Sequence, residues 1–156
     1  MPVYNKVIFV CMENICQSPM AAMLLKNMKR DEWIVAESRG LVVLFPEPYS
    51  VKAGMIMQNH GYFMENNTAK QLEEEDFSET TLILTMTKDE KQKIINEYTS
   101  PQNVYTIMEF VGSSGDIMDP YGGDNELYEM FYASILTWVD RVENKIHEIN
   151  TKEDLK

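Results

Sequence analysis

The first residue with evident chemical potential is Cys11, together with the loop that follows it. Cys11 comes directly after four apolar residues, 7–10, which have the character of a buried strand. The loop 12–18 leads to Ser18-Pro19, a typical helix start, so its free backbone N–H groups and the helix dipole would attract an anion. The same field favours the thiolate form of Cys11, which is the nucleophilic form of cysteine. This junction therefore predicts an anion site beside a nucleophile.

A second candidate group, Asp119, lies in a glycine-rich segment far along the chain. The segment 112–124 holds four of the seven glycines and is predicted to be an irregular loop with a functional role. It follows the last predicted strand, as Cys11 follows the first, so both residues belong at the carboxyl edge of a parallel sheet. From there Asp119 could protonate the leaving oxygen of a phosphate ester that Cys11 attacks, forming a cysteinyl-phosphate intermediate.

Each of these residues also has a purely structural interpretation. Cysteine at the end of a strand is often only a small buried apolar residue. Asp119-Pro120 is a common turn former, and Asn14 is suited to stabilising a turn. Ser18 is a good helix N-cap whatever the role of Cys11. Only the combination of these residues favours a catalytic site.

The elements that would position these residues alternate between strand and helix. Apolar, β-rich runs predict strands over 7–10, 33–38, 81–86 and 104–107. Helices are predicted over 18–29, about 51–59, 91–98 behind the capping box Thr87-x-x-Glu90, and 127–149, where apolar residues recur every three or four positions. This order predicts one α/β domain over 1–150, a three-layer α/β/α sandwich with a four-stranded parallel sheet and helices on both faces. Residues 151–156 are expected to form a frayed polar tail.

Composition narrows the class of protein. The 156 residues are 44% hydrophobic and 25% charged, as in ordinary globular domains. No apolar run is long enough to cross a bilayer and the N-terminus lacks the pattern of a secretory signal, so we expect a cytoplasmic protein. The net charge of −11 argues against nucleic acid or a membrane as partner. The two cysteines form no disulfide framework, and neither a metal site nor a cofactor is indicated; the oligomeric state is left open.

Taken together, these segments resemble the low-molecular-weight protein tyrosine phosphatases, including the bacterial branch that contains protein arginine phosphatases. The similarity is carried by Val10-Cys11 through Ala21, Ser38-Arg39-Gly40, 61–72, 82–87 and 104–123. The resemblance implies hydrolysis of a phosphoprotein or a small phosphomonoester, with Cys11 as nucleophile and Asp119 as general acid. It also implies that Asn14 and Ser18 support the thiolate and that Cys16 can form a reversible disulfide with Cys11. The other residues implied to line the phosphate loop and substrate site are Met12, Glu13, Ile15, Gln17 and Tyr121.

Two positions of the loop depart from the family pattern, in which cysteine is followed after five residues by Arg-Ser-Pro. Gln17 stands where the family has an arginine that grips phosphate with two charged hydrogen bonds. Glu13 stands where the family usually has glycine, and it adds an anion near the site. The charge of the loop changes from +1 to −1 relative to the family. We therefore expect weak phosphate binding, a raised pKa of Cys11 and strongly impaired turnover.

Three functions follow from this pattern. The first is an impaired cysteine-dependent phosphatase, and the second is an inactive pseudophosphatase that holds a cationic or neutral partner in the old cleft. The third is a redox-responsive protein in which Cys11 and Cys16 form a disulfide. The substrate is equally open, because Ile15 is typical of tyrosine-directed members whereas the segment 119–123 is typical of the arginine-directed branch.

Overall fold

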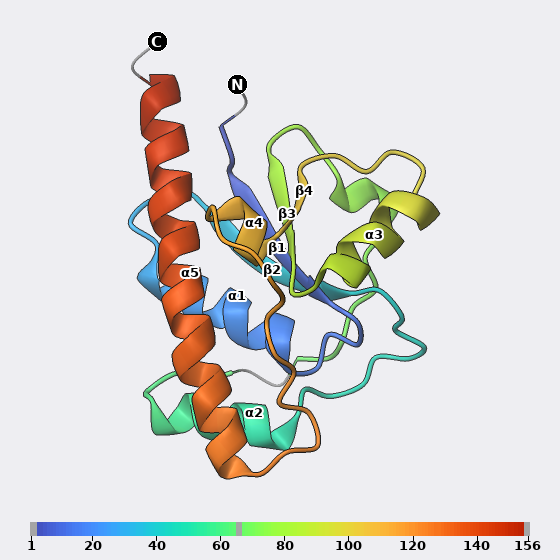
Figure 1. The fold of residues 1–156 in the computed structure, drawn as a ribbon, viewed down its shortest axis with the longest axis vertical. Coiled ribbons are helices and arrows are strands. Elements are labelled where there is room, and N and C mark those ends of the chain that lie inside the picture. The colour runs from blue at the N-terminus through green and yellow to red at the C-terminus, as the bar shows by residue number, and fades with distance from the viewer. Residues whose placement is uncertain (1–2, 65–66, 155–156) are drawn as a thin grey trace.

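The centre of the molecule is a parallel sheet of four strands in the order β2-β1-β3-β4 (Figure 1). The computed structural model describes residues 3–64 and 67–154. The strands are β1 (Lys6–Cys11), β2 (Val35–Gly40), β3 (Thr81–Thr85) and β4 (Val104–Thr106). All three pairings are parallel, and Cys11 at the end of β1 is paired with Gly40 at the end of β2. The predicted parallel sheet is confirmed.

Helices cover both faces of this sheet. The helices α1 (Gln17–Met28), α2 (Val51–Asn59), α4 (Ile107–Phe110) and α5 (Asn125–Asp154) surround the larger core, and α3 (Lys88–Glu97) packs on the opposite face (Figure 1). A short 3-10 helix, η1 (Glu74–Asp76), precedes β3. Side chains alternate along β1 because of the two-residue period of a strand: Val7 and Phe9 enter the larger core, and Ile8 and Val10 enter the smaller one. The three-layer α/β/α sandwich is therefore confirmed.

The start of α1 differs from the prediction. The helix begins at Gln17 with Cys16 in the N-cap position, and no side chain caps it. Ser18 and Pro19 therefore lie inside the first turn, and the prediction of Ser18 as N-cap was wrong. The physical reason is that the Ser18 hydroxyl is already engaged, because it lies 2.9 Å from the Cys11 sulfur and accepts a hydrogen bond from Asn14.

Other boundaries move by a few residues. β2 begins at Val35 and not at Trp33, because Ile34 N donates to the Asp31 carbonyl in a turn. Ile107 begins α4, a short helix that was not predicted, since Thr106 and Glu109 form a capping box there. The predicted box of Thr87 and Glu90 is confirmed, but α3 begins at Lys88 and not at Lys91, because Thr87 is the N-cap and Glu90 is already the third residue of the helix. α5 continues through 151–154, which were expected to be a frayed tail; residues 155–156 lie outside the described part.

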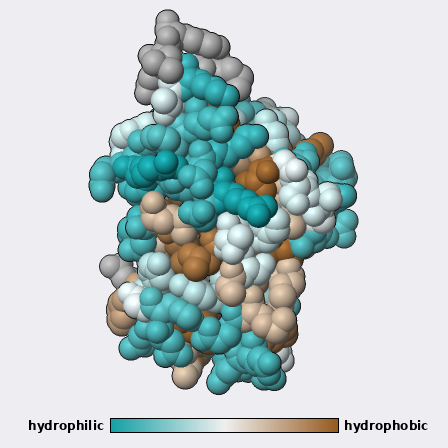
Figure 2. Space-filling model, turned by 60° about the vertical axis from the view of Figure 1, so that its left-hand side comes forward, coloured by the Kyte–Doolittle hydropathy of each residue, from teal (hydrophilic) through white to brown (hydrophobic). Residues whose placement is uncertain are grey.

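The surface is polar, in keeping with the net charge of −11. Figure 2 shows one face, on which hydrophilic residues predominate and hydrophobic residues form small separate areas. Over the ranges 3–64 and 67–154, no helix combines the length and the apolar character needed to span a membrane.

Candidate functional site

Cys11 lines a small cavity at the carboxyl edge of the sheet. The cavity has a volume of about 80 Å³ and is bordered by the loop 12–18, here called the phosphate loop, by the start of α3 and by the loop 112–124, here called the acid loop. Its lining residues are Cys11, Met12, Glu13, Ile15, Cys16, Gln17, Glu90, Asp119 and Tyr121. The fold thus brings Cys11 and Asp119 to one cavity, as expected for residues that follow two strands of a parallel sheet.

A chain of hydrogen bonds supports the Cys11 sulfur. Asn14 Nδ2 donates to Ser18 Oγ at 2.8 Å, and Ser18 Oγ lies 2.9 Å from Cys11 Sγ. Because the serine oxygen accepts from Asn14, its own proton is available to donate to the sulfur. Asn14 is itself held from two sides, by the Ser38 hydroxyl at 2.9 Å and by the Lys70 backbone N–H at 2.9 Å. Asn14 adopts a left-handed backbone with φ of 59°, which asparagine tolerates better than most residues. Asn14 and Ser18 therefore lie where the resemblance implied.

Burial nonetheless keeps both thiols protonated at neutral pH. Burial raises the pKa of Cys11 to about 11, although the hydrogen bond from Ser18 lowers it, and the charge of Glu90 adds to the increase. Burial also raises the pKa of Cys16 to about 12; a hydrogen bond with Tyr128 lowers this pKa, and Cys11 and Asp119 add to the increase. At pH 7, a thiol with a pKa near 11 is ionised in roughly one molecule in 10⁴. This agrees with the expected increase in the Cys11 pKa, although burial and not Glu13 is its main cause.

Gln17 has a role that the sequence did not indicate. Its side chain is buried, and its Nε2 donates to the Met118 carbonyl at 2.9 Å. The resemblance implied only that Gln17 lines the phosphate loop and substrate site. In the structure, one of its donors is used to tie the first turn of α1 to the acid loop, and Gln17 also lines the cavity.

The acid loop is also held in place by the start of α3 and by Met86, the residue after β3. Asp116 Oδ1 accepts a hydrogen bond from Lys88 N at 2.9 Å, and Ile117 N donates to the Met86 carbonyl at 2.9 Å. Asp119 is exposed, and one of its carboxylate oxygens accepts from Tyr121 N at 3.0 Å. Asp119 therefore forms a turn and also lines the Cys11 cavity.

Glu90 is a cavity residue that sequence reasoning missed. It is buried, and its Oε1 accepts from Met86 N and Thr87 N, both at 3.0 Å. Burial raises its pKa. The sequence identified Glu90 only as part of a capping box, yet the box directly follows β3, and the rule that placed Cys11 and Asp119 at this edge places Glu90 there too.

The electrostatics of the cavity are unusual for a phosphate site. Three carboxyl groups line it, from Glu13, Glu90 and Asp119, and no lysine, arginine or histidine is among the described residues of its lining. In the part of the chain that the structure describes, no three His, Cys, Asp or Glu side chains are placed together to hold a metal ion. The cavity therefore disfavours a dianion and carries no sign of a metal that would offset this charge.

Gly40 allows β2 to approach the phosphate loop closely. A Cβ atom at this position would lie 3.0 Å from the Cβ of Asn14 and 3.1 Å from the backbone carbonyl carbon of Glu13. The next residue, Leu41, donates its N–H to the Met12 carbonyl at 2.9 Å. The end of β2 thus forms one wall behind the loop, and this wall has no room for a larger residue.

Comparison with known proteins agrees with this geometry. A family model described as "Low molecular weight phosphotyrosine protein phosphatase" matches residues 6–153. The low molecular weight protein-tyrosine-phosphatase PtpB of Staphylococcus haemolyticus is 34% identical over 137 residues, covering 88% of this chain and 96% of that protein. The protein-arginine-phosphatase of Geobacillus stearothermophilus is 33% identical over 143 residues, covering 90% and 95%.

A solved structure shows the same fold. The YwlE arginine phosphatase from Geobacillus stearothermophilus superposes with a TM-score of 0.85 at 31% identity, covering 94% of this chain and 96% of that one. The shared fold, the extent of the match and the position of Cys11 after the first strand lead to one conclusion. The chain belongs to the low-molecular-weight phosphotyrosine protein phosphatase family, within its bacterial branch.

Proposed function

We propose that this protein is a cysteine-dependent phosphatase that acts on phosphoprotein or small phosphomonoester substrates in the cytoplasm, with turnover far below that typical of its family. The thiolate form of Cys11 attacks phosphorus as the bond to the leaving oxygen breaks, and protonated Asp119 gives its proton to that oxygen. Water then attacks the cysteinyl-phosphate, Asp119 accepts a proton from the water, and the S–P bond breaks to release phosphate and the Cys11 thiolate. The observation that carries the proposal is that Cys11 and Asp119, which are far apart in sequence, line the same cavity.

The low turnover has three causes. Within residues 3–64 and 67–154, the cavity lining includes three carboxyl groups and no cation, so a dianion binds weakly. The Cys11 thiolate is scarce because burial raises the pKa of Cys11 to about 11. Gln17 supplies no positive charge, and one of its donors is used by the Met118 carbonyl. Arginines directed at a transferring phosphoryl group contribute roughly 10³–10⁵ to the rate in well-studied enzymes.

Hydrolysis of an aryl phosphate tests this proposal. The native protein should hydrolyse it slowly but faster than the Cys11→Ser variant, since serine is a much weaker nucleophile than cysteine. The double variant Glu13→Gly/Gln17→Arg should raise kcat/KM by at least about 10², because it restores one preorganised donor and removes an anion. The matched control is Glu148→Ala/Gln92→Arg, which makes the same change in net charge at two exposed positions and should leave kcat/KM within about twofold.

Two outcomes would contradict the proposal in different ways. Fast native hydrolysis that Cys11→Ser abolishes would show that the site is not impaired. Equal rates for the native protein and Cys11→Ser would show that Cys11 does not catalyse this reaction. Running the assay with phosphoarginine beside the aryl phosphate compares the two substrate classes for which the relatives PtpB and protein-arginine-phosphatase are named.

A second candidate function is favoured by the acidic lining. A pseudophosphatase would use Glu13, Glu90 and Asp119 to hold a cationic group of a partner without turnover.

The redox alternative is supported by the two free cysteines, which line one cavity. It is weakened by the raised pKa of both thiols, because disulfide formation begins with a thiolate.

A further inference from the structure

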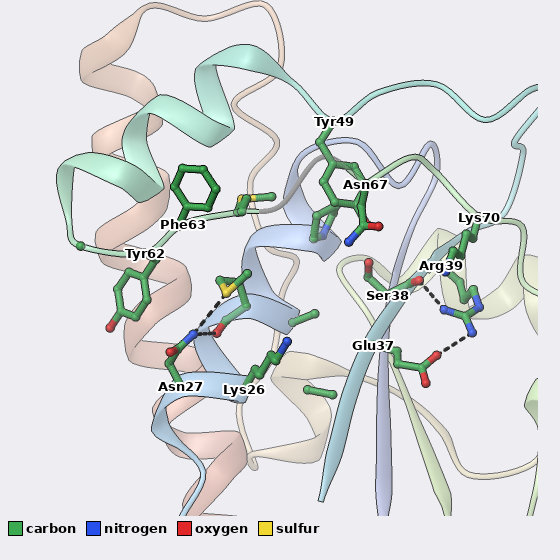
Figure 3. A pocket seen from close by; sticks show the side chains of 16 residues that line it. Lys26, Asn27, Glu37, Ser38, Arg39, Tyr49, Tyr62, Phe63, Asn67 and Lys70 are labelled. Atoms are coloured by element: carbon green, nitrogen blue, oxygen red, sulfur yellow. Dashed lines mark hydrogen bonds and ion pairs between the residues drawn. The ribbon is translucent and has the colours of Figure 1, made fainter.

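A second and larger cavity lies between α1, β2 and the segments 61–64 and 67–70 (Figure 3). Its volume is about 530 Å³, and it shares no lining residue with the Cys11 cavity. Pockets of roughly 300–1,000 Å³ are the usual size for small-molecule sites. This cavity, here called the α1–β2 pocket, has no role in the proposed phosphatase reaction.

The charge of the α1–β2 pocket is opposite to that of the molecule as a whole. Among the described residues that line it are three cationic side chains, Lys26, Arg39 and Lys70, and one carboxylate, Glu37. Arg39 is neutralised, since its Nη2 lies 2.6 Å from Glu37 Oε2 and its Nε lies 3.4 Å from Asp76 Oδ2. Among the residues that the structure describes, Lys26 and Lys70 have no acidic partner within 4.0 Å. A pair of lysines at one pocket, on a protein of net charge −11, favours an anionic ligand.

Three aromatic side chains also border the pocket. Tyr49, Tyr62 and Phe63 line it, and Figure 3 shows these rings along its upper and left-hand sides, with Lys26 and Lys70 at its lower and right-hand sides. Phe63 is 74% exposed, so most of its ring is available to cover a ligand. Stacking on such a ring binds flat aromatic groups whatever their polar substituents.

We propose that the α1–β2 pocket binds a small organic anion that carries an aromatic ring. Lys26 and Lys70 bind the anionic group, and the rings of Tyr62 and Phe63 cover the aromatic part. The Ser38 hydroxyl, which lines the same pocket, is buried and hydrogen-bonded to Asn14 and Tyr49. This assignment does not depend on phosphatase activity at Cys11.

The wall of the pocket is also the support of the phosphate loop. Ser38 Oγ accepts from Asn14 Nδ2 at 2.9 Å, and the Lys70 N–H donates to Asn14 Oδ1 at 2.9 Å. A ligand that contacts Ser38 and Lys70 is therefore two hydrogen bonds away from the Ser18 hydroxyl that lies against Cys11. A ligand bound in this pocket could therefore alter the conformation of the phosphate loop without occupying the Cys11 cavity.

Three small probes that a phosphatase cannot hydrolyse separate the roles of ring and charge. Naphthalene-1-sulfonate carries both, naphthalene-1-sulfonamide keeps the ring without the charge, and methanesulfonate keeps the charge without the ring. Amide NMR shifts of the ¹⁵N-labelled full chain report where each probe binds. Naphthalene-1-sulfonate should bind saturably at one site, with its largest shifts in 36–39, 61–64 and 67–70, and at least about tenfold more tightly than either partial probe.

Variants connect that binding to the named residues. Lys26→Glu and Lys70→Glu should each weaken the binding of naphthalene-1-sulfonate at least about fivefold. Phe63→Ala should also weaken this binding, and it should leave the fold intact because Phe63 is exposed and outside the core. Lys152→Glu, which makes the same change in net charge near the end of α5, should leave the affinity within about twofold. The spectrum of each variant reports whether it is folded. The proposal would be overturned if naphthalene-1-sulfonate caused its largest amide shifts in residues 12–18, or if it showed no saturable binding. It would also be overturned if Lys152→Glu weakened the binding as much as Lys26→Glu and Lys70→Glu do.

Discussion

At the scale of single residues, two opposing effects set the pKa of Cys11. The Ser18 hydroxyl and the amides of the phosphate loop stabilise a thiolate, whereas burial and the nearby Glu90 carboxyl favour the neutral thiol. Burial is the larger of these effects, so the pKa of Cys11 is raised to about 11. In an arginine-containing loop, a fixed positive charge would act against burial, but Gln17 offers none. The identity of residue 17 therefore affects both phosphate binding and the nucleophile.

The rate at which iodoacetamide alkylates Cys11 should depend strongly on pH. A raised pKa means that the thiolate is scarce below the pKa and forms as pH rises, so the rate should increase about tenfold per pH unit from 7 to 10 and level off near 11. Peptide mass spectrometry measures the rate at Cys11, and free glutathione, with an ordinary thiol pKa, is the reference that levels off near pH 9. A plateau for Cys11 already at pH 6–7 would show a stabilised thiolate and would revive the redox alternative.

At the scale of elements, the site is assembled where three strands end. β1 delivers Cys11, β3 leads to Glu90 in the capping box of α3, and β4 leads through α4 to the acid loop. Hydrogen bonds from Gln17 and Lys88 then join the acid loop to the starts of α1 and α3. The position of Asp119 is thus set by contacts with two helices and does not depend on the conformation of a free loop.

Gly40→Ala should damage the phosphate loop, because its new Cβ would lie 3.0 Å from the Cβ of Asn14 and 2.7 Å from Val43 Cγ2. We expect a loss of about 1–3 kcal/mol in the free energy of unfolding, the usual cost of overpacking. The matched control is Gly54→Ala in α2, where the new Cβ meets nothing within 4 Å and should stabilise the helix by about 0.5–1 kcal/mol. Urea unfolding of both variants measures the difference; equal effects would show that β2 does not crowd the loop.

At the scale of the whole molecule, α5 completes the larger core. Its apolar stripe, predicted from a spacing of three or four residues, packs against α1, α2 and α4. Phe131, Ile135, Val142 and Ile146 on this stripe are buried. The helix therefore covers one face of the layered structure and packs against α1 and α2.

Phe131→Ala should be among the most destabilising single changes. Phe131 is fully buried in the larger core, and removal of such a ring typically costs about 3–5 kcal/mol because a cavity remains. Its neighbour Met130 is 57% exposed, so Met130→Ala should cost less than about 0.5 kcal/mol. Denaturant midpoints and slopes give both values. A similar loss for the two variants would mean that α5 contributes little to the core.

The sequence by itself determined the alternation of strands and helices, the place of Cys11 before a helix start, and the shared sheet edge of Cys11 and Asp119. These features follow from local periodicity and from topology, which depend on residues close in the chain or on the order of elements. The sequence also indicated that position 17 carries no positive charge, because the charge of a side chain depends on residue type alone.

Only the tertiary structure decided where individual side chains direct their polar groups. The Gln17 amide reaches Met118, Ser18 turns to Cys11 and not to the helix start, and Glu90 borders the cavity as well as capping α3. The α1–β2 pocket likewise exists only where α1, β2 and the segments 61–64 and 67–70 meet. These contacts join residues up to 101 positions apart, and the depth of burial that raises the pKa of Cys11 depends on packing from several elements. The local sequence pattern carries no information on these long-range contacts or on the depth of burial.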